Sequence, residues 1–288
     1  MAKAVATLPR VFLGEALRQL RADSGKSLDA MAAHIGKDRQ RVIRLFEGKA
    51  TLTTDELDKL VTFLGATGKR RREIVALGVE ARKKPTSEPY TDKGPEPHRR
   101  LAYLEAMATT IVSYEKGIFP ALLHGPEYLN ALMESGEGIW WDSSDEHANR
   151  VAFRMERQRL VFESEKPKRV HLMFTDDALV AEVGNRDVMV RQFKHTLKTI
   201  QARDNLTVQI VPAAARNNPA QHGGITLFGF GTLLRPVGLL PVVYGPSTYF
   251  DKTEDTDKLT AAIKKIEKLA LSPEETKRVI EQKVMEGN

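Results

Sequence analysis

The residues from Lys37 to Lys49, KDRQRVIRLFEGK, combine side chains that can recognise bases with side chains that can pack into a core. In the major groove of DNA, arginine pairs bidentately with guanine and glutamine with adenine. Val42 and Leu45 are three residues apart, so a helix would bury both on one side and direct a polar set outward. This outward set is Arg39, Gln40 and Arg44. The pattern predicts a base-reading helix that begins at Asp38 as its N-cap.

A second helix is expected directly before this one. The stretch SLDAMAAHIG opens with Ser27, a suitable N-cap, and stops at Gly36. A helix, a tight turn at Gly36 and then the basic helix is the geometry of a helix-turn-helix. Residues 1–80 contain three further short amphipathic segments and no strand pattern, so they predict an all-α domain of five short helices.

This part of the chain resembles the lambda-Cro/repressor class of helix-turn-helix, often called the XRE family, over roughly Leu13 to Leu64. The resemblance rests on the Leu13-Gly14 opening, the LRQLR run, Gly25, Ala32, Gly36, the pair Val42 and Leu45, and Gly48. Two positions depart from the family: Ser27-Leu28 replaces a common Thr-Gln, and Phe46 replaces a common glutamate. The alternative is a helical protein-interaction module whose basic helix is only solvated.

The resemblance and the basic run together identify a set of residues expected to contact DNA. They are Ser27, Lys37, Arg39, Gln40, Arg41, Arg44 and Lys49. A single small helix-turn-helix makes few contacts, so we expect a homodimer that reads a palindromic or pseudo-palindromic operator with half-sites about one helical turn apart.

The charge of the chain is unevenly distributed. Residues 1–84 hold 18 Lys and Arg against 10 Asp and Glu, a net of +8, whereas the other 204 residues have a net of −2. A basic excess confined to one segment points to a polyanionic partner for that segment. The chain has no cysteine and no long apolar stretch or secretory leader, so we expect a cytoplasmic protein, associated with the nucleoid when bound to DNA.

A linker is predicted over residues 81–100, where the sequence is rich in proline and charge and almost devoid of apolar side chains. Residues 101–288 then predict an α+β domain with a small mixed sheet. Helices are expected at about 101–114, 126–133, 145–162, 186–202, 253–271 and 273–285, and strands at 169–174, 206–212, GITLFGF and LPVVYGP. The strand, helix and strand from Arg169 to Pro212 have the length of a right-handed crossover between parallel strands.

Residues 101–285 also resemble the effector domain of actinobacterial WhiJ-type regulators, through the blocks YLEAMATTIVSYEKGIFPALLHGPEYLNALM, RMERQRLVF, LTVQIVPAAA and LSPEETKRVI. The resemblance implies a repressor-like transcriptional regulator with a small partner protein of the BldB type, in pairs that have been likened to antitoxin and toxin. The segment Leu122–Gly125, LLHG, replaces the more usual Leu-Leu-Gln-Thr, and YGPSTYF lacks a glutamate often found after its tyrosine.

An enzyme is not expected. His171, His195 and His222 show no i, i+4 pair of the kind that binds zinc on a helix, and the adjacent Asp176 and Asp177 would point to opposite faces of a strand. There is no phosphate-binding glycine loop and no nucleophile elbow, so we expect neither a cofactor nor a metal.

Four residues of the second domain are candidates for partner binding. Trp140 and Trp141 are adjacent and cannot both be buried against one face, and tryptophan is enriched at interfaces. Arg154 and Arg157 would lie on one side of a helix and could form a basic groove, although solvated side chains with internal ion pairs would have the same pattern. Three further functions remain open: a metabolite-responsive repressor, an antitoxin that regulates its own gene, and an interaction protein without a DNA target.

Overall fold

The computed structural model describes residues 6–83, 90–91, 97–139, 144–231, 234–242 and 248–287. The chain divides into two compact units. The first contains Met1–Tyr103 together with Pro246–Asp251, and the second contains Leu104–Gly245 together with Lys252–Asn288. The chain therefore passes between the two units three times.

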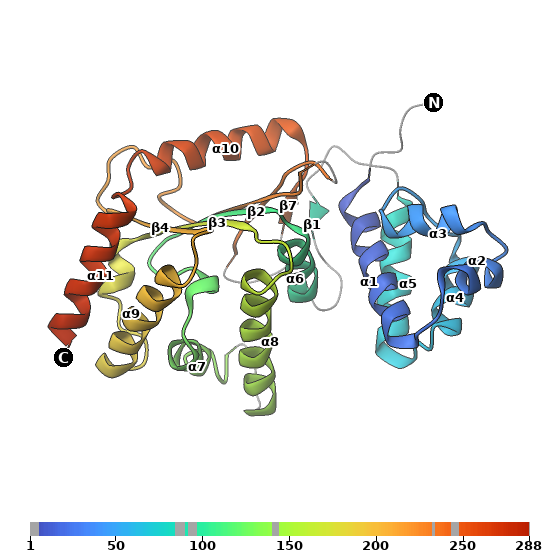
Figure 1. Ribbon diagram of the computed structural model, residues 1–288, viewed down its shortest axis with the longest axis horizontal. Coiled ribbons are helices and arrows are strands. Elements are labelled where there is room, and N and C mark those ends of the chain that lie inside the picture. The colour runs from blue at the N-terminus through green and yellow to red at the C-terminus, as the bar shows by residue number, and fades with distance from the viewer. Residues whose placement is uncertain are drawn as a thin grey trace. The chain divides into compact units, whose positions relative to one another are not determined.

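Five helices form most of the first unit, as the sequence predicts. They are α1 (Leu8–Ser24), α2 (Leu28–His34), α3 (Arg39–Phe46), α4 (Thr54–Phe63) and α5 (Gly68–Arg82). The apolar sides of these helices form a common core that includes Phe12, Leu17 and Met31, all with side chains that are fully buried. The two helices of the predicted helix-turn-helix, α2 and α3, pack against each other (Figure 1).

The ends of these helices are set by capping residues. Ser27 and Asp38 occupy the N-cap positions of α2 and α3, and each side chain accepts a hydrogen bond from a backbone N–H three residues later. At the end of α2, Gly36 has a φ of 63°, and the Lys37 N–H donates to the Ala32 carbonyl over 2.9 Å. This left-handed cap ends α2 in a tight turn, so only four residues separate α2 from α3.

One close approach between helices depends on a residue without a side chain. A Cβ at Gly14 of α1 would lie 2.5 Å from the carbonyl oxygen of Phe46 and 2.8 Å from that of Leu45. Because Gly14 has no Cβ, α1 can lie directly against the end of α3.

Two short strands also belong to the first unit. They are β1 (Tyr90–Thr91) and β7 (Thr248–Phe250), which pair antiparallel. The rings of Tyr90 and Tyr249 lie 5.9 and 6.0 Å from that of Phe12 in α1, at distances typical of packed aromatic pairs. The predicted linker 81–100 thus contains the end of α5 and all of β1, and α6 (Pro97–Met107) begins inside it.

The second unit is built on a mixed sheet with the strand order β6-β5-β2-β3-β4. The strands are β2 (Thr110–Glu115), β3 (Arg169–Thr175), β4 (Leu206–Val211), β5 (Ile225–Gly229) and β6 (Val237–Leu240). Strands β2, β3 and β4 are parallel, whereas β5 pairs antiparallel with both β2 and β6. The predicted α+β class with a small mixed sheet is confirmed.

Helices cover both faces of this sheet (Figure 1). Between β2 and β3 the chain forms the short turn η1 (Ala121–Leu123), α7 (Pro126–Glu134) and α8 (Ser144–Phe162), and α9 (Arg186–Gln201) joins β3 to β4. Both crossovers move one strand in the same direction, so right-handed connections put these helices on one face. The helix α10 (Thr253–Glu267) lies on the other face, and α11 (Pro273–Gly287) packs against α9 and β4.

One element differs in kind from its prediction and another is displaced. Of the strand expected at LPVVYGP, only Leu240 belongs to β6 among the described residues, and Pro241 and Val242 are not in a strand. The helix expected over 101–114 ends at Met107, and Thr110–Glu115 is the strand β2 at the centre of the sheet. Its β-branched start, Thr110 to Val112, favours extended backbone, and pairing with β3 and β5 on its two sides stabilises it. Among the described residues, no helix is long and apolar enough to cross a membrane.

Candidate functional sites

The helix α3 has one buried side and one polar side. Val42 and Leu45 are almost fully buried, whereas the three side chains predicted to read bases are exposed. These three are Arg39, Gln40 and Arg44. The structure therefore brings two guanidinium groups and one carboxamide, the groups that pair with guanine and adenine, to the same exposed side of one helix.

The ion pair that Arg39 makes is weak enough to exchange for DNA. Its Nε lies 3.7 Å from Oδ1 of Asp29, and the two side chains are 62% and 75% exposed. Exposed pairs of this kind contribute about 0–1 kcal/mol.

Two lysines flank this helix with closer acidic partners. Lys37 lies 2.8 Å from Glu56, and Lys49 lies 2.9 Å from Glu47. The Lys37 ammonium group and the Thr53 backbone N–H both bond to the Glu56 carboxylate and lower its pKa to about 2. Both lysines are exposed at the two ends of α3, where phosphates of a bound duplex could replace their present partners.

Ser27 has a structural role that is compatible with DNA contact. Its hydroxyl oxygen accepts from the Ala30 N–H over 3.1 Å, and the residue is exposed. A hydroxyl that accepts one bond can still donate its proton to a phosphate oxygen.

Arg41 does not share the exposed side, and its contact with DNA stays a prediction. Its Nη2 donates to the Thr51 carbonyl over 2.8 Å, and its Nε is buried. Position 41 precedes the buried Val42 and faces the loop between α3 and α4, so its guanidinium holds that loop.

Phe46, which departs from the family pattern, belongs to the core. The residue is buried, and the Arg18 guanidinium lies 6.0 Å from the centre of its ring. Arg18 also donates to the Phe46 carbonyl and pairs with Glu15. The aromatic ring therefore packs the end of α3 against α1.

Of the four candidate partner residues of the second unit, the structure describes two, Arg154 and Arg157. Trp140 and Trp141 lie outside the described residues. Arg157 forms a bidentate ion pair with Glu105, with N–O distances of 2.6 and 2.8 Å, and the two side chains are only 11% and 7% exposed. Arg157 is an internal link between α8 and α6 and is not a surface for a partner. Arg154 is half-buried, and burial, with the charges of Arg157 and Arg150, lowers its pKa to about 10.

The three histidines considered above for a zinc site, His171, His195 and His222, are not brought together. His171 of β3 contacts Gln209 over 2.7 Å and lies 3.3 Å from Glu267 of α10. His195 lies on α9, on the opposite face of the sheet, and His222 lies in an exposed loop (Figure 1).

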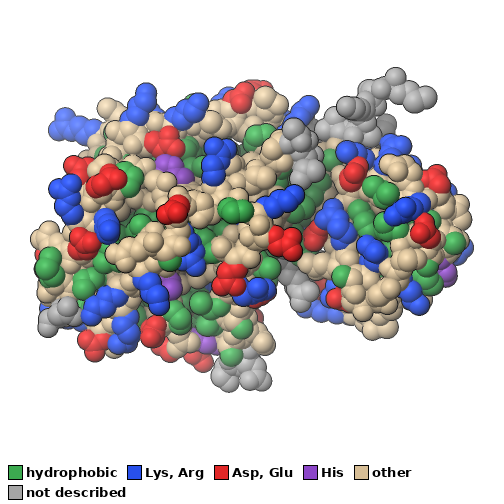
Figure 2. Space-filling model, viewed as in Figure 1, with side chains coloured by type: hydrophobic (Ala, Val, Ile, Leu, Met, Phe, Trp, Pro, Cys, Tyr) green, Lys and Arg blue, Asp and Glu red, His purple; other side chains and the backbone are tan. Residues whose placement is uncertain are grey.

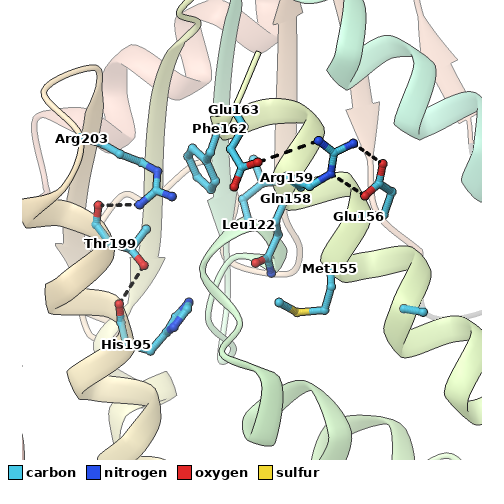
Figure 3. Close-up of a pocket in the computed structure, with 11 residues that line it drawn as sticks. Leu122, Met155, Glu156, Gln158, Arg159, Phe162, Glu163, His195, Thr199 and Arg203 are labelled. Atoms are coloured by element: carbon cyan, nitrogen blue, oxygen red, sulfur yellow. Dashed lines mark hydrogen bonds and ion pairs between the residues drawn. The ribbon is translucent and has the colours of Figure 1, made fainter. Parts of the chain in front are cut away.

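A pocket of about 440 Å³ lies between α8 and α9, and no pattern in the sequence had indicated it (Figure 3). Most of its wall is one side of α8, from Ala152 to Phe162, together with Glu163 directly after the helix. The opposite wall is a stripe at four-residue spacing, His195, Thr199 and Arg203, and Leu122 of η1 completes the lining. The four-residue spacing of the second wall is visible in the sequence. However, α8 ends some forty residues before Arg203, so spacing alone could not show that the two walls face each other.

Acidic and basic side chains are interspersed over the face of the second unit that Figure 2 shows. This distribution fits the near-neutral charge of residues 85–288. On this face the described side chains therefore form no single large field of one charge.

Comparison with known proteins finds two family models that match this chain, one in its N-terminal part and one in its C-terminal part. Residues 13–74 match a family model described as a helix-turn-helix domain. Residues 98–282, well over half of the chain, match a model described as a domain of unknown function, DUF5753. No curated protein and no solved structure gives a significant match. The helix-turn-helix indicates DNA binding and transcription regulation, and the chain belongs to the DUF5753 family.

Proposed function

We propose that the protein is a sequence-specific transcription regulator of the lambda-repressor (XRE) class, and that α3 enters the major groove of its operator. The observation that supports this proposal is the exposed set Arg39, Gln40 and Arg44 opposite the buried Val42 and Leu45. Each good bidentate pair contributes about 1–3 kcal/mol of discrimination between bases. Ser27, Lys37 and Lys49 would add phosphate contacts, which fix the register of the helix on the duplex.

The proposal includes a homodimer. A recognition helix of eight residues reaches only a few base pairs. Two copies related by a twofold axis would read two half-sites about 34 Å apart, one turn of B-DNA.

Selection of binding sites from a random duplex pool tests this function. The full-length protein should enrich a motif with two related half-sites whose centres are one helical turn or a multiple of it apart. An Arg41→Lys variant is a useful control, because Arg41 faces the α3–α4 loop and its conservative replacement should leave the enriched motif unchanged. A pool that shows no enriched motif after several rounds would contradict the proposal.

For the second unit we propose a regulatory role by binding and not by catalysis. The resemblance to WhiJ-type regulators favours a small BldB-type protein as the partner. Two exposed apolar side chains of this unit, Ile139 and Val180, are 69% and 70% exposed and could contribute to such an interface. Co-purification with the product of an adjacent small gene tests this role. An Ile139→Ser, Val180→Ser double variant should lose the partner if these side chains contact it. Retention of the partner by the double variant would show that they do not.

A further inference from the structure

The pocket between α8 and α9 has an apolar base. Leu122 from η1, with Met155 and Phe162 from α8, lines its interior, and Figure 3 shows these side chains between the two helices. A volume of about 440 Å³ lies within the range of pockets that hold small organic ligands. The pocket is therefore large enough for a ligand with an apolar body of several carbon atoms.

Two arginines and two glutamates line the pocket, but both glutamates pair with the same arginine. Arg159 makes a bidentate pair with Glu156 and lies 3.8 Å from Glu163. Arg203 has no carboxylate partner within the described part of the chain. Its guanidinium lies 4.6 Å from the centre of the Phe162 ring, and its Nη1 donates to the Thr199 carbonyl over a long 3.4 Å. Most of the donors of Arg203 thus remain available for an anion.

Two further polar groups face the same space. The Gln158 Nε2 donates to the carbonyls of Ala121 and His124, so its Oε1 is left as an acceptor. Burial, and then the charges of Arg203 and Lys198, lower the pKa of His195, so its imidazole is neutral near pH 7. A neutral imidazole offers one donor and one acceptor.

We propose that this pocket binds a small organic monocarboxylate, with its carboxylate on the Arg203 guanidinium and its apolar body against Phe162, Met155 and Leu122. A planar carboxylate matches the fork of arginine donors. A single negative charge balances Arg203, whereas a phosphate dianion would add repulsion from Glu156 and Glu163. Binding of such a ligand would control the proposed regulator, and only this consequence rests on the proposed function.

Direct binding to the full-length protein tests the site without any DNA, so failure of the site and failure of the DNA-binding function are distinguishable. The probes are phenylacetate, 4-phenylbutyrate and octanoate, with their neutral amides and phenyl phosphate as comparators, measured by thermal shift and calorimetry. At least one carboxylate should bind at millimolar concentration or below, and its amide and phenyl phosphate should bind about tenfold more weakly or worse.

Matched variants locate the site. Arg203→Gln should weaken binding of the carboxylate by about 10-fold or more. Lys198→Gln, which removes a charge from the end of α9 outside the pocket lining, should change the affinity less than about twofold. Ala152→Trp fills the pocket from an exposed position and should abolish binding while circular dichroism stays native. The proposal is overturned if no carboxylate binds, if amides or phenyl phosphate bind as well, or if folded Arg203→Gln and Ala152→Trp variants bind like the wild type.

Discussion

At the scale of single residues, the arginines of α3 differ in their exposure and hydrogen bonding. Arg39 and Arg44 are exposed, whereas Arg41 is half-buried and donates to the Thr51 carbonyl. The outward positions of the first two follow from helical spacing against Val42 and Leu45. The role of Arg41 does not, because it depends on where the loop after α3 lies, and a local pattern does not contain that information.

Arg41→Ala should therefore reduce stability and spare sequence preference. The change removes a charged hydrogen bond that is partly buried, so we expect a loss of about 1–2 kcal/mol in the free energy of unfolding. Urea unfolding measures the loss, and competition between operator and scrambled DNA measures the preference. Exposed Arg72 on α5 supplies the control, since Arg72→Ala should change neither quantity. A stable Arg41→Ala protein that has lost its preference would contradict this assignment.

His124 should make the second unit sensitive to acid. It is buried, and its Nε2 lies 2.7 Å from the Phe119 carbonyl. Burial, with the nearby charges of Arg154 and Arg157, lowers its pKa to about 4, from 6.5. The folded state thus binds fewer protons than the unfolded state between pH 6.5 and 4, so this contribution to stability is complete above pH 6.5 and is lost as the pH falls toward 4.

His124→Gln should remove that dependence, because an amide N–H can still donate to the Phe119 carbonyl and does not titrate. Relative to the variant, the wild type should lose on the order of 3 kcal/mol of stability between pH 7 and pH 4. Denaturant unfolding of both proteins at several pH values provides the difference, in which other titrating groups cancel. A difference that stays constant with pH would contradict this, because it would mean that His124 takes up its proton as readily in the folded as in the unfolded state.

At the scale of elements, the contact between α1 and α3 should tolerate no side chain at Gly14. Alanine there is favourable for a helix by about 1 kcal/mol, but its Cβ would approach the Phe46 carbonyl oxygen to 2.5 Å. Forcing the backbones apart costs more, so Gly14→Ala should destabilise the first unit by about 1–3 kcal/mol. Thermal unfolding checks this result. Gly223→Ala is the control, because nothing lies within 4 Å of its added Cβ. Equal melting of the two variants would argue against the close approach.

The elements also show how far local sequence predicts this fold. The five helices of the first unit, the strands β3 and β4 and the helix α9 follow from apolar spacing and capping residues such as Ser27 and Asp38. The strand β2 was missed, because its alternating burial depends on β3 and β5, which lie far away in the sequence. The pocket was missed for the same reason: Phe162 ends α8, Arg203 follows α9, and the two residues meet only in the folded sheet unit.

At the scale of the whole molecule, the first unit includes a strand from near the end of the chain. Tyr249 of β7 is fully buried, and its ring lies 6.0 Å from Phe12 and 6.2 Å from Tyr90. The pairing of β7 with β1 closes this cluster. A helical domain predicted to be complete in residues 1–80 therefore lacks two of the three aromatic rings that pack together here.

Tyr249→Ala should consequently destabilise the first unit although the residue is far from it in sequence. Loss of a buried aromatic ring should lower the free energy of unfolding by about 3–5 kcal/mol. Tyr249→Phe retains the ring and should cost less than half as much. Hydrogen exchange of α1 amides localises the effect, and unchanged protection of α1 in Tyr249→Ala would refute the placement of this strand.

The central claim is that α3 reads DNA sequence, and fluorescence anisotropy tests it most directly. The protein is titrated with DNA from upstream of its own gene and with scrambled DNA, at salt concentrations rising to about 0.15 M. We predict that the wild type and Arg72→Ala keep their preference for the upstream DNA. An Arg39→Ala, Arg44→Ala double variant should stay folded and lose that preference, with only weak, salt-sensitive binding left. Equal affinity of the wild type for both DNAs, vanishing as salt rises, would contradict the account, because the basic helix would then sense only phosphate.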